Sequence, residues 1–246
     1  MLRISSILSL LIAVTGTVAC STIDSSDLET SGMIANIEVV RLQSGGGSDV
    51  HVSLTAGTLD FVDLEPGDEL KATFGADEVT LDQGDFLGAL SYNGHVAASA
   101  QGDVVTVALE RADKTPAPDS TVTLPALIDI AAPAASTAFS RADDDITVTV
   151  NGEDSDVGAT LTWLGDCIDA GSLDIPAGQT SVTINKGTIK KKAQVDANDP
   201  DSQPVDDNCG ITLRVRRESA GSLDGNYKSG SIVAASQATR DLTSQP

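Results

Sequence analysis

Short runs that alternate apolar and polar residues are the feature that most limits the fold of this chain. Residues 49–55 and 103–110 each place three aliphatic side chains at every second position, with polar side chains between them. Side chains of a strand point alternately to its two faces, so this pattern predicts strands with one buried face. The predicted inward positions in these two runs are Val50, Val52, Leu54, Val105, Val107 and Leu109.

Similar runs continue to the C-terminus, and turn signals separate them. Pro66-Gly67 predicts a tight turn, and both Asn93-Gly94 and Asn151-Gly152 predict turns between strands. Helical periodicity is scarce, and the chain has 22 glycines, so we expect an all-β protein. The predicted inward positions of the second half are Ile146, Val148, Val150, Ala159, Leu161, Trp163, Val182, Ile184, Ile211, Leu213 and Val215.

A proline-rich stretch divides the alternating runs into two groups. Residues 114–126 contain three prolines, which disfavour a helix or a central strand. We therefore predict two β-sandwich domains in series, at residues 33–113 and 127–246, with residues 114–126 as a stiff connector.

The N-terminus has the layout of a secretory leader. Arg3 is followed by a mostly apolar run that ends in small residues at Ala19, and the run is too short and polar for a comfortable transmembrane helix. Residues 1–19 are predicted to be a signal peptide. Residues 20–32 are polar and acidic without periodicity, which predicts a flexible tether with a span of about 20 Å.

Val18, Ala19 and Cys20 resemble the lipobox of bacterial lipoproteins, although Thr17 stands where leucine is commonest. The resemblance implies cleavage before Cys20 and acylation of that cysteine, which would hold the protein at a membrane. By the same resemblance, Ser21 after the cysteine favours the outer membrane. The expected location is therefore the cell envelope, with a lipid anchor.

Two further resemblances concern the folded part. The strand count, Trp163 in the expected third strand and the connector before it make residues 127–246 similar to immunoglobulin-like or fibronectin type III-like sandwiches. The whole chain also resembles uncharacterised bacterial lipoproteins with two β domains. The residues that carry this second likeness are Pro118, Ser120, Val122, Leu124 and Pro125. That family supplies no function to transfer.

Cys167 and Cys209 are the remaining cysteines. In an oxidising compartment two remaining cysteines usually form a disulfide. Antiparallel pairing of the Trp163 strand with residues 210–215 would bring the two thiols together. The alternative is a redox or metal pair, which would ordinarily show closer spacing or a nearby histidine.

The net charge of −21 makes the chain a poor ligand for nucleic acid phosphates. A cofactor is not expected, with calcium as the alternative, because acidic loops supply the oxygen ligands that it needs. The best calcium candidate is residues 196–201, which are similar to the acidic calcium segment of cadherins; residues 143–145 and 153–156 are weaker candidates. The ligands of the best candidate would be Asp196, Asn198, Asp199 and Asp201.

The function predicted from these features is that of a membrane-anchored envelope lipoprotein, a non-catalytic scaffold or binding module. Its partner would be another envelope protein or a surface polymer. One alternative is a calcium-dependent adhesion module. The other is an envelope hydrolase, which would need His51 or His95 in a pocket beside a buried carboxylate.

Overall fold

The computed structural model describes residues 21–43, 45–57, 60–86, 89–153, 156–193 and 205–246. Within these residues the protein is all-β, as predicted, and its only helices are two single 3-10 turns, Ser25–Asp27 and Thr30–Gly32. No helix in this part of the chain is long and apolar enough to cross a membrane. The strands are β1 (Ser21–Asp24), β2 (Ile34–Arg41), β3 (Ser48–Thr55), β4 (Asp60–Asp63), β5 (Glu69–Phe74), β6 (Asp77–Thr80), β7 (Asp82–Phe86), β8 (Ala89–Val96), β9 (Val104–Glu110), β10 (Ala117–Thr123), β11 (Ile128–Ala132), β12 (Ala138–Ser140), β13 (Ile146–Gly152), β14 (Ala159–Gly165), β15 (Gly171–Ile175), β16 (Ser181–Ile184), β17 (Cys209–Ala220) and β18 (Ser229–Gln245).

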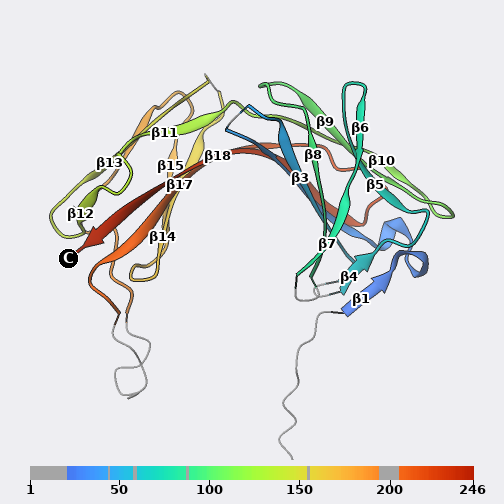
Figure 1. The fold of residues 1–246 in the computed structure, drawn as a ribbon, viewed down its shortest axis with the longest axis horizontal. Coiled ribbons are helices and arrows are strands. Elements are labelled where there is room, and N and C mark those ends of the chain that lie inside the picture. The colour runs from blue at the N-terminus through green and yellow to red at the C-terminus, as the bar shows by residue number, and fades with distance from the viewer. Residues whose placement is uncertain (1–20, 44, 58–59, 87–88, 154–155, 194–204) are drawn as a thin grey trace, which may run out of the picture.

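One large sheet runs through the whole molecule. Its main strand order in the described residues is β1-β4-β3-β2-β18-β17-β14-β15. In addition, β8 pairs with β3, β7 pairs with β8, and β12 pairs with β18. Two small sheets, β10-β9-β5-β6 and β11-β13-β16, cover its two halves. Figure 1 shows the result as an arch of two lobes, in which the small sheets lie outside and the large sheet lines the inside.

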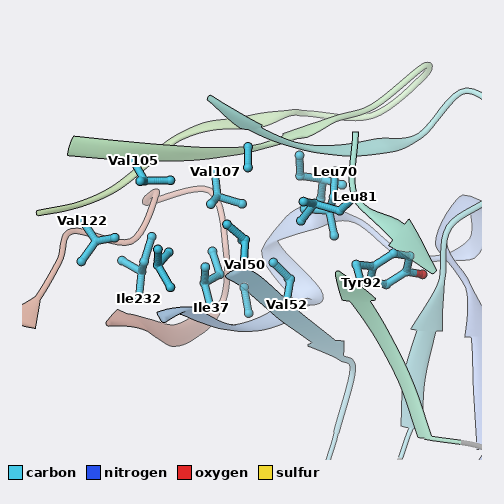
Figure 2. Close-up of a cluster of buried hydrophobic side chains, with 14 of the residues drawn as sticks. Ile37, Val50, Val52, Leu70, Leu81, Tyr92, Val105, Val107, Val122 and Ile232 are labelled. Carbon is cyan, nitrogen blue, oxygen red and sulfur yellow. The ribbon is translucent and has the colours of Figure 1, made fainter. Parts of the chain in front are cut away.

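The first lobe is a β-sandwich between the large sheet and β10-β9-β5-β6. Figure 2 shows Val105, Val107 and Leu70 from the small sheet pointing toward Ile37, Val50 and Val52 from the large one. The inward positions predicted on β3 and β9 are all buried in this core. Burying an aliphatic side chain of this size contributes about 1.5–3 kcal/mol, so the alternation itself supplies much of the driving force for the lobe.

The second lobe packs β11-β13-β16 on the other half of the large sheet. Its core holds Trp163 and the predicted aliphatic positions of β13, β14 and β17, all buried. Ile184 of β16 is buried as predicted, whereas Val182 is only partly buried against the core. The pairing of β14 with β17 is antiparallel, as expected from the sequence.

Strand β18 belongs to both lobes. Its first half pairs in parallel with β2, from Ser229 opposite Ile34 to Ser236 opposite Arg41. Its residues from Val233 to Ser244 pair antiparallel with β17. Its even-numbered side chains face inward throughout: Ile232 and Ala234 enter the first core, and Ala238 and Leu242 enter the second. Both cores therefore lie on the same face of the large sheet.

This strand changes the predicted domain division. Residues 127–246 do not form a self-contained second domain, because Tyr227, Ile232 and Ala234 pack in the first core. The proline-rich stretch is not a free connector either. It forms β10, which pairs antiparallel with β9 at the edge of the small sheet, and only about residues 125–127 cross between the lobes. Edge strands tolerate proline because one row of their N–H groups needs no partner.

Residues 21–32, predicted to be a flexible tether, are instead folded against the first lobe. Strand β1 pairs in parallel with β4, and the two 3-10 turns follow it. The Arg111 guanidinium donates to the carbonyls of Ser25 (2.7 Å) and Leu28 (3.1 Å), and it lies 2.7 Å from the Asp68 carboxylate. Buried polar groups need such partners, and here the backbone of the polar segment supplies them.

The predicted turn at Asn93-Gly94 is wrong, whereas Asn151-Gly152 stands where β13 ends. Asn93-Gly94 lies inside β8, where a Cβ on Gly94 would stand 2.4 Å from Cδ2 of the buried Leu81. Gly152 ends β13, where a Cβ would stand 2.2 Å from the Leu127 carbonyl oxygen. Gly94 therefore allows close packing inside a strand, and Gly152 allows close packing at the end of its strand. Gly67 does occupy a turn, with φ of +101° and a hydrogen bond from Asp68 to Glu65.

The predicted disulfide is present. Cys167, in the turn after β14, bonds to Cys209 at the start of β17, with 5.9 Å between their Cα atoms. Because β14 and β17 are neighbours, the bond joins strands of one sheet and does not cross the sandwich. It closes a 42-residue separation in the sequence.

Candidate functional site

The inner side of the arch is the face of the large sheet that no other sheet covers. Odd-numbered side chains of β18 point to it, and so do the polar side chains that alternate with the core positions on β2, β3, β8, β14 and β17. We call this surface the arch face. Its principal side chains are Asn36, Glu38, His51, Ser53, Ser91, Asn93, Thr160, Thr162, Asp174, Arg214, Arg216, Glu218, Ser231, Val233 and Gln237.

A hollow of about 570 Å³ lies on the arch face of the second lobe. Thr160 and Thr162 of β14 form its floor beside Arg214 and Arg216 of β17, and Asp174 of β15 lies at its edge. The hollow offers hydroxyl groups and guanidinium donors together, so it can hydrogen-bond a polar ligand that lies along the strands.

Arg216 connects the two lobes across the arch face. Its Nη2 lies 2.5 Å from the Glu38 carboxylate on β2, and its Nε lies 2.5 Å from Glu218 on its own strand. Burial opposes the charge of Arg216, but hydrogen bonds to Glu218 and Glu38 outweigh it and raise its pKa above the ordinary value. Arg216 is therefore a fixed cation at the centre of the face.

A second hollow, of about 430 Å³, lies on the arch face of the first lobe. Asn36, Glu38, Ser53 and Ser231 contribute to its lining. His51 also lines it and is held by a 2.7 Å hydrogen bond between Nδ1 and Asn93 Oδ1. This second hollow presents mainly neutral donors and acceptors.

His95 lies outside both hollows. Its Nδ1 is 2.8 Å from Asp49 Oδ1, and its Nε2 is 2.8 Å from the Gly46 carbonyl. The hydrogen bond to Asp49 raises the pKa of His95 above its ordinary value. Asp49 is 41% exposed, so this pair is not the histidine beside a buried carboxylate that a hydrolase would need.

The junction between the lobes is rigidly built. Arg41, at the end of β2, donates to the Ser99 carbonyl (2.7 Å) and the Pro125 carbonyl (3.0 Å), and it forms a two-point ion pair with Glu153. The hydrogen bond from Arg41 holds the pKa of Glu153 below its ordinary value. The backbone N–H of Leu127 also donates to this carboxylate, at 2.8 Å.

Arg217 closes the same junction from β17. Its Nη1 donates to the carbonyls of Ala126 (3.3 Å) and Leu127 (3.2 Å). Burial lowers the pKa of Arg217, and the nearby Glu153 carboxylate opposes that effect. With β18 continuous through both lobes, these contacts fix the angle of the arch and therefore the shape of the arch face.

The predicted lipidation site and the best predicted calcium site lie outside the described residues. The former is Cys20, and the latter comprises Asp196, Asn198, Asp199 and Asp201. Of the weaker acidic candidates, Asp154 also lies outside the described residues, and three others have structural partners. Asp144 accepts the Ser140 N–H, Asp145 accepts the Lys186 N–H, and Glu153 binds Arg41. Among the described residues, no three side chains of the types His, Cys, Asp or Glu form a group that could hold a metal ion.

Sequence reasoning missed the buried arginines, although a signal for them exists. Arg41, Arg111 and Arg217 each stand two positions after the last inward aliphatic residue of a strand, at the next inward position. A cation at an inward position of a strand is buried, so it must find hydrogen-bond acceptors. The arch face itself could not be found from sequence, because it depends on which strands are neighbours.

No family model and no curated protein matches the chain. Among solved structures, it is similar to a cytokine receptor complex (10% identity, 82% of this chain and 94% of that chain, TM-score 0.30). It is also similar to the BSP domain of a biofilm associated protein (16% identity, 86% of this chain and 30% of that chain, TM-score 0.24). A third is a set of immunoglobulin domains of Sidekick-1 (8% identity, 82% of this chain and 59% of that chain, TM-score 0.17). At TM-scores this low, none of these likenesses assigns a function to the chain.

Proposed function

We propose that the protein is a non-catalytic binding module, held at the outer membrane of a cell envelope by lipid on Cys20. The observation that carries the binding role is the arch face: one open, polar sheet surface that spans both lobes and is fixed in shape by β18 and the Arg41–Glu153 pair. Its partner would be another envelope protein or a surface polymer that lies across the face.

The composition of the arch face supports a polar partner. Threonine side chains line the hollow of the second lobe, and serine and asparagine side chains line that of the first. Arg216 and Glu38 stand between the hollows as a fixed ion pair. Such a surface gains specificity from matched hydrogen bonds, because a partner that leaves the buried donors and acceptors unpaired loses affinity.

The anchoring role rests on the sequence. The predicted leader ends in Val18 and Ala19, Cys20 follows it, and the first described strand begins at Ser21. Two or three acyl chains on one cysteine would hold the protein at the bilayer almost irreversibly, since each buried methylene contributes about 0.8 kcal/mol.

The binding role can be tested with matched surface variants. The mature chain is used to capture partners from intact envelopes, with and without chelator. Asn36→Lys combined with Thr160→Lys places a long cation in each hollow of the arch face. Thr147→Lys combined with Thr183→Lys is the control, because these exposed threonines hydrogen-bond to each other on the small sheet of the second lobe.

We expect the arch-face variant to lose a partner that the control retains. Equal capture by both variants would contradict the assignment of the face. Loss of capture with chelator alone would instead favour calcium-dependent adhesion. The anchor is tested separately by mass spectrometry of the protein from its native membrane, where Cys20 should be N-terminal and acylated.

A further inference from the structure

The point where the chain would leave the membrane is fixed by β1. Strand β1 begins at Ser21 and runs parallel to β4, with Ser21 opposite Asp60, and the Ser21 hydroxyl donates to the Asp60 carboxylate. Consecutive Cα atoms are about 3.8 Å apart, so a lipidated Cys20 would be attached at the very edge of the fold. This end of the first lobe would therefore lie against the bilayer without a spacer.

Strands β7 and β8 reach the same end of the lobe. The Tyr92 hydroxyl of β8 donates to the Val62 carbonyl of β4 (2.9 Å), and Gln83 of β7 donates to Asp63 (3.0 Å). Strands β4 and β8 both pair antiparallel with β3, so they run in the same direction. The starts of β1, β4 and β8 and the end of β7 thus gather at one end, as Figure 1 shows. We call this the anchor end.

Phe86 stands at the anchor end and is exposed to water. It is the last residue of β7, paired with Ala89 at the start of β8, and 78% of it is exposed. An aromatic side chain this exposed keeps its apolar ring in water, so transfer of the ring into an apolar phase would be favourable. The nearest apolar phase to this residue would be the membrane that holds Cys20.

We propose that Phe86 inserts into the interfacial layer of the membrane beside the lipidated Cys20, and so sets the orientation of the arch on the bilayer. This inference rests on the proposed lipid anchor. Two contacts at one end of the lobe, the acyl chains and Phe86, would keep the protein from rotating freely about its anchor.

The membrane surface that Phe86 would enter is one of low charge. The anchor end carries Asp60, opposite Ser21, and the whole chain has a net charge of −21, so anionic headgroups would repel it. Attraction must therefore come from burial of the aromatic ring and not from charge. Binding should weaken as anionic lipid is added to the bilayer, and salt should relieve that weakening.

The test uses the mature chain with a lipid coupled to the Cys20 thiol by maleimide, which is selective because Cys167 and Cys209 are joined. Phe86→Trp reports the environment of the anchor end. Val104→Trp is the matched control, since Val104 is 50% exposed in the same lobe but pairs with Thr123 beside the crossing between lobes. The native Trp163 is buried in the second core and gives a constant background.

In phosphatidylcholine vesicles, F86W should shift its emission to shorter wavelength and be quenched by brominated acyl chains. V104W should show neither effect. Unquenched F86W, or equal quenching of both variants, would overturn the proposed contact while leaving the anchor standing. An unmodified Cys20 in protein from native membranes would overturn the proposed function and this contact together.

Discussion

Arg41 and Glu153 meet across the boundary between the lobes, with Nη1–Oε2 at 2.5 Å and Nη2–Oε1 at 3.1 Å. The side chain of Arg41 is 3% exposed, whereas that of Glu153 is 40% exposed. The buried cation therefore depends on a carboxylate that stands partly in water. Residues 112 positions apart in the sequence are joined here, and this pair is the clearest sign that the lobes form one unit.

Glu153→Gln should destabilise the protein. The amide cannot neutralise Arg41, which keeps only backbone carbonyls as partners, and the buried charge is left unpaired. Because Glu153 is partly exposed, we expect a loss of about 2 kcal/mol in the free energy of unfolding, below the value for a fully buried pair. Urea denaturation measures it. Glu29→Gln, which removes an exposed pair with Lys114, is the control and should cost about 0.5 kcal/mol or less.

The same carboxylate predicts a pH dependence. The pKa of Glu153 is lowered by its hydrogen bond from Arg41, so its contribution is present above the ordinary pKa of about 4.5 and is lost as the pH falls through the folded value. Glu153→Gln lacks this contribution at every pH. The unfolding free energies of the two proteins should therefore differ near neutral pH and converge in acid. A difference that stays constant from neutral pH to about pH 3 would contradict this account.

Asp68→Asn should release residues 21–32 from the first lobe. Asp68 accepts hydrogen bonds from Ser25 Oγ (2.7 Å) and the Ala112 N–H (3.0 Å) and pairs with buried Arg111. Burial alone would raise the pKa of Asp68, but these contacts outweigh it and lower the pKa. We expect a loss of about 3 kcal/mol and faster proteolytic cleavage within residues 21–32, measured by denaturation and mass spectrometry of the fragments. Cleavage at the wild-type rate would show that the segment is held by other contacts.

Removal of the disulfide should lower the stability of the whole molecule. Cys167→Ser combined with Cys209→Ser frees a loop of 42 residues, for which chain entropy predicts a loss of about 4 kcal/mol. Since β18 is common to both lobes and pairs with β17 and β2, calorimetry should show a single transition that moves to lower temperature. Two separate transitions would mean that the lobes unfold independently despite the shared strands.

His95 should titrate above the ordinary pH range of histidine. The hydrogen bond to Asp49 favours the protonated ring, so the pKa of His95 is raised, and Asp49→Asn should bring it down. Proton NMR of the ring Cε1–H measures both values. A raised pKa means that any contribution of the pair to stability is present below the ordinary histidine pKa and is lost as the pH rises through the folded value.

The main core strands could be predicted from the sequence because they carry their own alternation. Val50, Val107 and Leu213 lie inward as expected, because the alternation within a strand decides which of its side chains face the core. Pairing is not local. Strand β18 looks like the last strand of a second domain, yet its first half pairs with β2, almost 200 residues earlier. Nothing near Ile232 in the sequence specifies that neighbour.

The folded N-terminal segment was missed for a related reason. Residues 21–32 have few apolar side chains, so composition predicts a tether. Their order comes from backbone carbonyls that accept hydrogen bonds from Arg111, and a carbonyl looks the same in every residue. Asn93-Gly94 was predicted as a turn but lies inside a strand, because the role of Gly94 depends on Leu81, which lies between β6 and β7.

The long strand β18 also dictates an order of events during synthesis. The first lobe is encoded early, but its sheet lacks the neighbour of β2 until the chain has been made as far as Ser236. The ribosome must therefore have synthesised the chain into β18 before either half can close its core. Until residues 229–236 have been made, the nascent chain leaves one edge of β2 unpaired.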